Sequence, residues 1–501
     1  MVTSAFGTLN DKYNSKVNEG ISMEQTSTPA GTLRKNALGM WSIVFFVLAT
    51  NGPLTGLVGV VPTAILMGNG VGLPGVFLLV GAVYLLFAVG FVAMGRHIRN
   101  AGAFYAYVAA GLGRPFGAAA AFLAIVAYAG MQIACYGLIG YFTAEAFLRV
   151  GINLEWWVAS IGYALLVQVF GTRNVEFNGR FLALLMLAEL VVIVVFDVAV
   201  VWHGGGPEGF SVLSFEPCKV FATGLGAALV FVGGAFMGFE TTAIYAEEAR
   251  DPGRTLPRAT FTALLLIMLF YALSSWLLLV AIGPSVAIDK IAQDPGAIWF
   301  QLSSQLVGVA LADAINILLV TSLFAVLLSF HNSLSRYLFA MGRERILPGL
   351  LAVTHRKHQT PYLASTLQTV TCVVLLVAFG IGGADPITQV LPLGSAPATI
   401  GILAVQCLTS IAVMRYLRGN PCGVGVWQAL IAPALSAAAL AYGVILIVNN
   451  MSLLTGGESV FNTLIPLGML LVAVAGMCLA GWHKWRNPQI YAKLGRVLDE
   501  V

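Results

Sequence analysis

The chain has 501 residues, of which 58% are hydrophobic and only 10% are charged, with a net charge of +4 at pH 7. Soluble globular domains carry about 25% charged residues, so this composition excludes that class and indicates a polytopic membrane protein. The small net charge gives no sign of a nucleic-acid partner, and no long polar stretch inside the chain marks a second domain.

The two ends of the chain are polar. Residues 1–36 contain no apolar segment of the signal-peptide kind, so we expect a disordered cytoplasmic tail there, and a second cytoplasmic tail at 484–501. The six cysteines are scattered, without Cys-x-x-Cys or any metal-ligand spacing, so we expect neither a disulfide framework nor a metal site. Only Cys218 is expected in an external loop.

Twelve apolar stretches are long enough to cross a membrane. A helix needs about 20 apolar residues to span the hydrocarbon core. We therefore expect an all-α protein with about twelve transmembrane helices, at roughly 38–68, 73–95, 116–148, 155–171, 178–202, 221–247, 259–283, 307–341, 362–380, 387–416, 427–449 and 461–482.

The positions of Lys and Arg predict the orientation, because cytoplasmic loops are enriched in these residues. With the N-terminus inside, only Arg149, Lys219 and Lys290 of the 26 basic residues fall on the outer side. We therefore expect a multi-pass protein of the cell (inner) membrane, with its N- and C-termini in the cytoplasm.

Two of these helices are predicted to be broken. A proline inside a helix removes a backbone donor and clashes with the preceding turn, and the first span contains the stretch Thr50-Asn51-Gly52-Pro53-Leu54-Thr55-Gly56. The sixth span has Gly233, Gly234 and Gly238 ahead of Glu240. The breaks lie five helices apart, and an odd repeat length reverses the second copy, so spans 1–5 and 6–10 are predicted to form inverted repeats. Paired broken helices indicate a transporter binding site near the midplane.

Glu240 lies where a charge is costly, which makes it a functional-site hypothesis. Two interpretations stay open: a protonatable carboxylate that couples pH or gating to the site, or a carboxyl that caps the broken helix. In the fifth span, Glu189 is interpreted either as an ion-coupling group or as a structural hydrogen-bond partner. Asp197 is nearer the outer end of that span, and we expect it to be solvated rather than functional.

Other polar residues inside the spans are also candidates for functional or structural roles. Thr321 and Ser322 in the eighth span are candidate hydroxyl ligands for sodium, or hydroxyls that bond back to their own helix. Gln132 in the third span is interpreted as a substrate contact or as interhelical packing. We expect His331 to make a structural or gating contact near the cytoplasmic end of the eighth span.

Three segments resemble the amino acid–polyamine–organocation (APC) permeases. They are similar to the family's sixth-helix signature, to the segment before its third helix, and to the end of its eighth helix with the following loop; here they lie at 236–259, 100–107 and 332–361. The resemblance implies a LeuT-type five-plus-five fold that grips its substrate between broken helices 1 and 6. The substrate-binding residues expected on this basis are Thr50, Asn51, Gly52, Pro53, Leu54, Thr55, Gly56, Gln132, Phe236, Gly238, Phe239 and Glu240.

The chain departs from this family at two places. The family's first-helix Gly-Ser-Gly-Ile-Phe is absent, and Thr55-Gly56-Leu57 stands where Gly-Ser-Gly would be. Several proton-coupled relatives carry a fifth-helix Lys in place of a sodium ion, where this chain has Glu189. A carboxyl cannot supply a fixed positive charge, so the coupling ion stays open between H⁺ and Na⁺. The expected coupling or gating residues are Glu240, Glu189, Thr321 and Ser322.

The leading hypothesis is a secondary active permease that imports an amino acid or a related amine by proton symport and alternating access. A precursor–product antiporter and a non-transporting membrane sensor are the alternatives. Residues 37–420 are expected to form the transporter core and 421–483 helices 11 and 12. Protease, hydrolase and phosphate-loop motifs are missing, so we expect neither an enzyme nor a cofactor. Two carboxylates in the cavity would favour an amine-rich substrate, but a proton relay explains them equally well.

Overall fold

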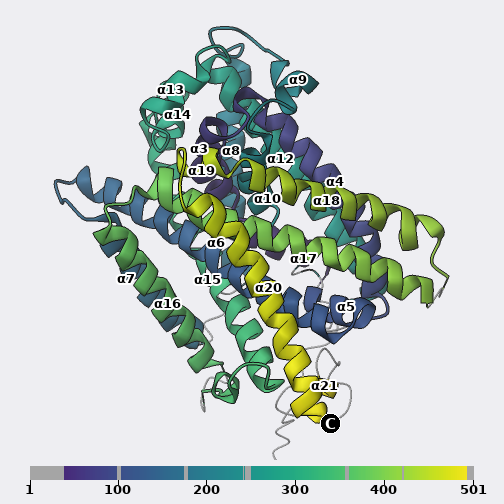
Figure 1. Cartoon of the computed structure of the whole chain (residues 1–501). Coiled ribbons are helices and arrows are strands. Elements are labelled where there is room, and N and C mark those ends of the chain that lie inside the picture. The colour runs from purple at the N-terminus through teal and green to yellow at the C-terminus, as the bar shows by residue number, and fades with distance from the viewer. Residues whose placement is uncertain are drawn as a thin grey trace, which may run out of the picture.

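A computed structural model of the chain describes residues 39–98, 103–173, 179–240, 242, 250–355, 360–419 and 423–493. The described residues form helices and turns without a strand (Figure 1). The principal helices are α2 (Met40–Asn51), α3 (Val61–Met67), α4 (Leu73–Gly95), α5 (Ala103–Leu112), α6 (Arg114–Leu148), α7 (Trp156–Thr172), α8 (Gly179–Trp202), α10 (Leu225–Ala235), α12 (Pro252–Ile282), α14 (Ile298–Leu306), α15 (Val309–Arg343), α16 (Tyr362–Ile381), α17 (Leu391–Gly419), α18 (Ala432–Asn449), α20 (Phe461–Arg486) and α21 (Pro488–Lys493).

The fold is that of a polytopic membrane protein. Within the described residues, ten helical segments are long and apolar enough to cross a membrane. The fourth and sixth predicted spans correspond instead to two shorter apolar helices, α7 and α10. The sixth span is not one continuous helix, because α10 ends at Ala235 and a turn follows over 236–240.

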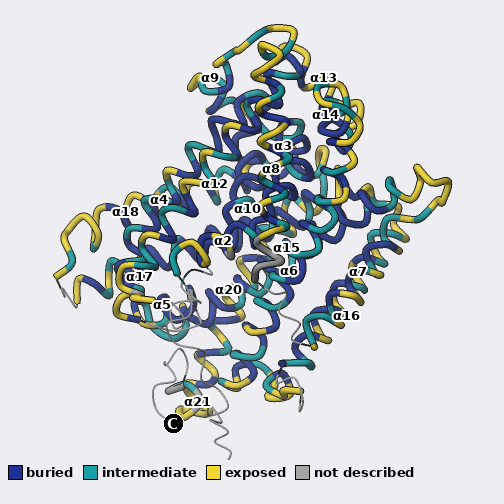
Figure 2. Tube along the Cα trace, turned by 180° about the vertical axis from the view of Figure 1, so that it is seen from behind, coloured by how far each residue is buried: buried dark blue, intermediate teal, exposed yellow. Residues whose placement is uncertain are grey.

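Close packing of α6 against α17 forms the centre of the bundle (Figure 1). Small residues allow this approach: a Cβ atom on Gly394 would lie 2.8 Å from the backbone nitrogen of Ala134 and from the carbonyl oxygen of Gly130. Interfaces of membrane helices are enriched in such residues because they let the backbones meet. Helices α7 and α16 pack together at one side, and Figure 2 shows the buried residues concentrated around α2, α10 and α15.

The predicted tails are described only in part. Residues 1–36 and the motif residues Asn100, Ala101 and Gly102 lie outside the described residues. At the C-terminal end, α20 continues to Arg486 and α21 follows, so the described part of the predicted 484–501 tail is helical.

Candidate functional site

The first predicted break is present between α2 and the next helical segment. Helix α2 ends at Asn51, and Gly52 takes a positive φ of 56°, a conformation that glycine adopts without strain. The chain resumes as a π-helix, η1 (Thr55–Val60), which continues into α3. Single π-helical turns are rare and occur frequently at functional sites.

The second break lies directly beside the first. Gly238, in the turn after α10, has a φ of 109°, and a Cβ atom there would lie 2.8 Å from the Cγ2 atom of Thr50. Figure 2 shows α2 and α10 in the buried interior of the molecule. The tertiary structure thus brings together two interruptions that are far apart in the sequence.

A cavity opens between the two breaks and three further helices. It holds about 500 Å³ of empty space, some of it open to solvent. Its polar lining comes mainly from the first break, while α6, α10, α15 and α17 contribute chiefly apolar side chains, among them Met131, Leu138, Phe231, Met237, Phe330 and Leu391. None of the described residues that line the cavity carries a charge.

Asn51 provides an unused hydrogen-bond acceptor at this cavity. Its side-chain nitrogen donates to the carbonyl oxygen of Val47 at 3.0 Å. Its Oδ1 atom is buried and has no hydrogen-bond partner among the described residues. Burying a carbonyl oxygen without a hydrogen-bond partner costs free energy. This atom is therefore suited to accept a hydrogen bond from a bound ligand.

The predicted substrate-binding residues divide into two groups. Thr50, Asn51, Thr55 and Gly56 line the cavity. The remaining residues of the two breaks, which do not appear in the described lining, are Gly52, Pro53, Leu54, Phe236, Gly238, Phe239 and Glu240.

Gln132 takes part in a polar network away from the cavity. Its Nε2 atom donates to Oε1 of Gln368 on α16 at 3.2 Å. Gln368 in turn donates to the carbonyl oxygen of His331 at 2.8 Å, and the His331 ring bonds to Ser365 at 2.8 Å. These bonds connect α6, α15 and α16, so the geometry favours the structural interpretation of both Gln132 and His331.

Glu240 closes its own helix break. The carboxyl is fully buried, and its Oε2 atom accepts a hydrogen bond from the backbone N–H of Gly238 at 2.9 Å. Its Oε1 atom accepts a hydrogen bond from the hydroxyl of Tyr128 on α6. Both carboxyl oxygens are therefore engaged by protein donors, and the carboxyl connects the second break to α6.

Glu189 is connected to the first break. Its Oε2 atom accepts hydrogen bonds from Ser322 Oγ at 2.8 Å and from the backbone N–H of Leu54 at 3.5 Å. The hydroxyl of Thr55 donates to Ser322 at 3.1 Å. Thr321, the neighbouring candidate, instead donates to the carbonyl oxygen of Leu318 on its own helix at 2.9 Å. Of the two hydroxyls proposed for ion coupling, only Ser322 joins the Glu189 network.

Tyr271 on α12 is a site residue that the sequence interpretation did not include. Its hydroxyl donates to the carbonyl oxygen of Gly52 at 3.4 Å, and a Cβ atom on Gly56 would collide with its ring. The tyrosine is buried, and it is the one tyrosine of α12. The presence of one tyrosine in a span could have indicated a site residue. It could not have predicted which group accepts the hydrogen bond from the hydroxyl.

Asp197 is not solvated, contrary to the expectation from its position near the end of the span. Only 6% of its surface is exposed, and its Oδ2 atom accepts a hydrogen bond from Ser274 on α12 at 2.6 Å. The packing of α12 against α8 covers this carboxyl, which the depth argument could not anticipate.

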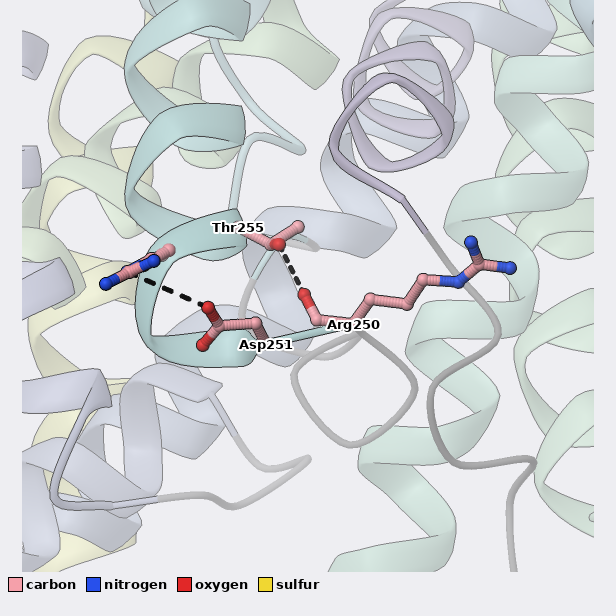
Figure 3. Close-up of polar contacts among 4 residues, drawn as sticks. Arg250, Asp251 and Thr255 are labelled. Atoms are coloured by element: carbon pink, nitrogen blue, oxygen red, sulfur yellow. Dashed lines mark hydrogen bonds and ion pairs between the residues drawn. The ribbon is translucent and has the colours of Figure 1, made fainter.

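The charged segment after the second break contains a surface ion pair. Arg254 and Asp251 approach to 3.8 Å, and the hydroxyl of Thr255 donates to the carbonyl oxygen of Arg250 (Figure 3). Both charged side chains are largely exposed, so this pair contributes little stability. Glu247 and Glu248 of the same charged segment lie outside the described residues.

Comparison with known proteins places these features in context. A family model described as amino acid permease matches residues 38–474. The chain is 27% identical over 270 residues to the branched-chain amino acid permease BcaP of Bacillus subtilis, covering 53% of this chain and 51% of the relative. It is 26% identical over 257 residues to the methylthioribose transporter of the same organism, covering 51% of each.

A third relative is the aromatic amino acid transport protein AroP of Escherichia coli. The identity is 25% over 228 residues, which covers 44% of this chain and 49% of the relative. The chain thus spans about half the length of the curated relatives it matches.

Proposed function

The chain belongs to the amino acid permease family, and from the geometry of its cavity we propose that it is a secondary transporter of a neutral amino acid with an apolar side chain. The observation that carries this proposal is the uncharged lining between the two helix breaks. A polyamine or a cationic side chain would leave a charge in this cavity without a counter-charge, which is unfavourable in a buried site.

Each part of such a substrate has a complement in the cavity. The ammonium group can donate to the Oδ1 atom of Asn51, the buried acceptor without a partner. The carboxylate fits beside the hydroxyl groups of Thr50 and Thr55, which line the cavity at the first break. The side chain fits the thioether and aromatic surface formed by Met131, Met237 and Phe330.

The names of the relatives agree with a substrate that carries no net charge. One is a branched-chain amino acid permease, one an aromatic amino acid transport protein, and one a methylthioribose transporter. These substrates differ in shape but all present an apolar part, which supports the class of substrate rather than one compound. Neither Glu189 nor Glu240 lines the cavity, so these carboxyls do not argue for an amine-rich substrate.

We further propose that transport is proton symport by alternating access, with import as its direction. The support is the Glu189 network, in which one carboxyl contacts the first break through the Leu54 N–H and through Ser322. Protonation of Glu189 would remove its charge and weaken both bonds, so proton binding would alter the geometry of the break. The same site with Thr55 and Ser322 offers oxygen ligands to Na⁺, which makes sodium the competing coupling ion.

The topology belongs to the same proposal. Twelve crossings and a LeuT-type arrangement of two inverted five-helix repeats are supported by the meeting of the first and sixth interruptions at one cavity. Cytoplasmic termini in the inner membrane are supported by the distribution of Lys and Arg along the chain. Broken helices with backbone freed at membrane depth are tolerated where they line such a cavity.

The test is counterflow and gradient-driven uptake in proteoliposomes that contain the purified protein. We expect leucine, methionine and phenylalanine to exchange, lysine and putrescine not to compete, and an inward proton gradient to drive accumulation without sodium. Exchange of the cationic compounds alone would contradict the substrate class. Uptake that requires sodium and ignores pH would contradict proton coupling, and strict one-for-one exchange without accumulation would favour an antiporter.

The variant Asn51→Ala tests whether Asn51 binds the substrate. Loss of a hydrogen bond to a charged group costs about 1.5–3 kcal/mol, so substrate affinity should fall by roughly 10- to 100-fold. Asn450→Ala is a matched control, because Asn450 makes the same bond to the carbonyl four residues earlier, at 2.8 Å, in a segment away from the cavity. Equal effects of the two variants would remove Asn51 from the binding site.

A further inference from the structure

Helix α8 carries two buried acidic residues, and only one of them belongs to the network described above. Glu189 is 5% exposed and Asp197 is 6% exposed. Their separation by eight positions corresponds to about 12 Å along a helix, with both side chains on the same broad face. Asp197 lies five residues before the end of the helix at Trp202, on the predicted outer side.

The carboxyl of Asp197 has one satisfied and one unsatisfied oxygen. Oδ2 accepts the hydrogen bond from Ser274, whereas Oδ1 is buried and has no hydrogen-bond partner among the described residues. Glu240 differs in this respect, because both of its oxygens are engaged by protein donors. An unpartnered carboxyl oxygen in a buried position points to a group that binds something during function.

Among the described residues, no fixed charge compensates Asp197. Helices α2, α12, α14 and α15 pack against α8. Their titratable or charged side chains in the described residues are Tyr271, Arg254 and Arg258 on α12, and Asp313, His331, Arg336, Tyr337 and Arg343 on α15; α2 and α14 have none. None of these forms a salt bridge with Asp197 in the described part of the chain. A buried carboxylate without a positively charged partner is strongly unfavourable, so this carboxyl requires a proton or a bound cation.

Helix α12 supplies polar groups between the two acids. Ser274 bonds to Asp197, and Tyr271, three residues earlier, donates to the carbonyl oxygen of Gly52 in the first break. Side chains on a helix lean toward its N-terminus, which places the Tyr271 hydroxyl about one turn inward of its backbone. The Tyr271 hydroxyl therefore extends from the region of Ser274 toward the first break. Glu189 contacts the same break through the Leu54 N–H.

We propose that Asp197 is a second proton-binding group of the transporter, located on the outer side of Glu189 and exchanging a proton with it along the interface of α8 and α12. The proposal rests on the proton coupling proposed above. In this step an O–H bond at the Asp197 carboxyl breaks and one at the Glu189 carboxyl forms, so Asp197 becomes a carboxylate and Glu189 a neutral acid. Asp197 is reprotonated from the outer solution, and Glu189 releases its proton to the inner side.

The experiment compares two measurements on the same proteoliposomes: accumulation driven by an inward proton gradient, and counterflow without a gradient. Asp197→Asn keeps the size of the side chain and a hydrogen bond to Ser274 but cannot carry the proton. We expect it to lose gradient-driven accumulation by about tenfold or more, equivalent to at least about 1.4 kcal/mol, while counterflow stays near the wild-type rate. Glu189→Gln should lose gradient-driven accumulation as well.

Two further variants make the result specific. Asp313→Asn is the matched control, because Asp313 is an exposed acid on α15, and it should retain both activities. Asp197→Glu restores a titratable carboxyl, so it should recover gradient-driven uptake with a shifted pH dependence. A purely structural hydrogen bond predicts the opposite, since the longer side chain would fit no better than asparagine.

The possible results separate this proposal from the proposed function. If the wild type shows no proton-driven uptake, the proposed coupling fails. If the wild type and Asp197→Asn accumulate substrate equally while Glu189→Gln does not, the role of Asp197 is overturned. Failure of Asp197→Glu to restore coupling in a folded protein, or a sodium requirement that disappears in Asp197→Asn, also overturns it. Size-exclusion profiles and thermal unfolding of every variant establish that the protein is folded.

Discussion

At the scale of single residues, the three buried carboxyls differ in what they contact. Glu240 is held by the Gly238 N–H and by Tyr128, Glu189 by Ser322 and the Leu54 N–H, and Asp197 by Ser274 alone. All three look alike in the sequence, as acids inside apolar stretches. Apart from the Gly238 N–H, their partners lie far away along the chain, so only the folded structure separates a capping role from a titrating one.

The Glu240–Tyr128 contact leads to a prediction about stability. Tyr128→Phe removes one donor to a fully buried carboxyl. We expect the free energy of unfolding to fall by about 1–3 kcal/mol, measured by detergent-induced unfolding in mixed micelles. Tyr442→Phe is the control, because Tyr442 is 60% exposed and should be neutral. Equal stability of the two variants would show that the Tyr128 hydroxyl does not support Glu240.

At the scale of the element, the two helix breaks were predictable but their contacts were not. Gly52 and Pro53 mark the first break because they combine backbone freedom with a missing donor. The sequence did not indicate that η1 would be a π-helix, because backbone hydrogen-bond registers depend on packing. It also did not indicate that Thr50 would face Gly238.

Gly52→Ala tests the geometry of the first break. The residue has a positive φ, and an added Cβ atom would lie 2.5 Å from Val326 Cγ2 and 3.0 Å from Ser322 Oγ. We expect destabilisation by about 1–3 kcal/mol together with a loss of counterflow, because the strained backbone and the clash act on the site directly.

Gly468→Ala is the control for this substitution. Gly468 lies inside α20 with open space around it, and alanine favours a helix over glycine by about 1 kcal/mol. Its variant should therefore be at least as stable as the wild type and should transport normally. If Gly52→Ala transports as well as Gly468→Ala, the left-handed turn at Gly52 is not required for function.

At the scale of the whole molecule, the membrane orientation makes a prediction that needs no substrate. Cys218 is exposed in the segment between α8 and α10, and Leu350 is exposed after α15. In a variant that keeps only Cys218, a membrane-impermeant maleimide should label intact cells. In a variant whose only cysteine comes from Leu350→Cys, labelling should require permeabilised cells, because that segment is predicted to be cytoplasmic.

The reverse pattern of labelling would invert the predicted topology. A variant with all six cysteines replaced by serine should not react on either side and sets the background. Labelling of both positions in intact cells would show that membrane integrity was lost, so a cytoplasmic marker protein is measured in the same samples.

The class of the protein was determined by the sequence alone. Its apolar composition excluded a soluble fold, its Lys and Arg distribution predicted an orientation, and three segments resembled the permease family to which the chain belongs. These properties are local or additive along the chain, because membrane insertion responds to hydrophobicity and to flanking charge over short windows.

The chemistry of the site was decided only by the tertiary structure. Cavity lining, the unused acceptor of Asn51, the pairing of Glu189 with Ser322 and the burial of Asp197 all depend on which helices pack together. A buried polar side chain takes its role from the donors and acceptors within about 3 Å of it. Those partners lie more than 70 residues away along the chain for Glu189 and Asp197, beyond the reach of any local pattern.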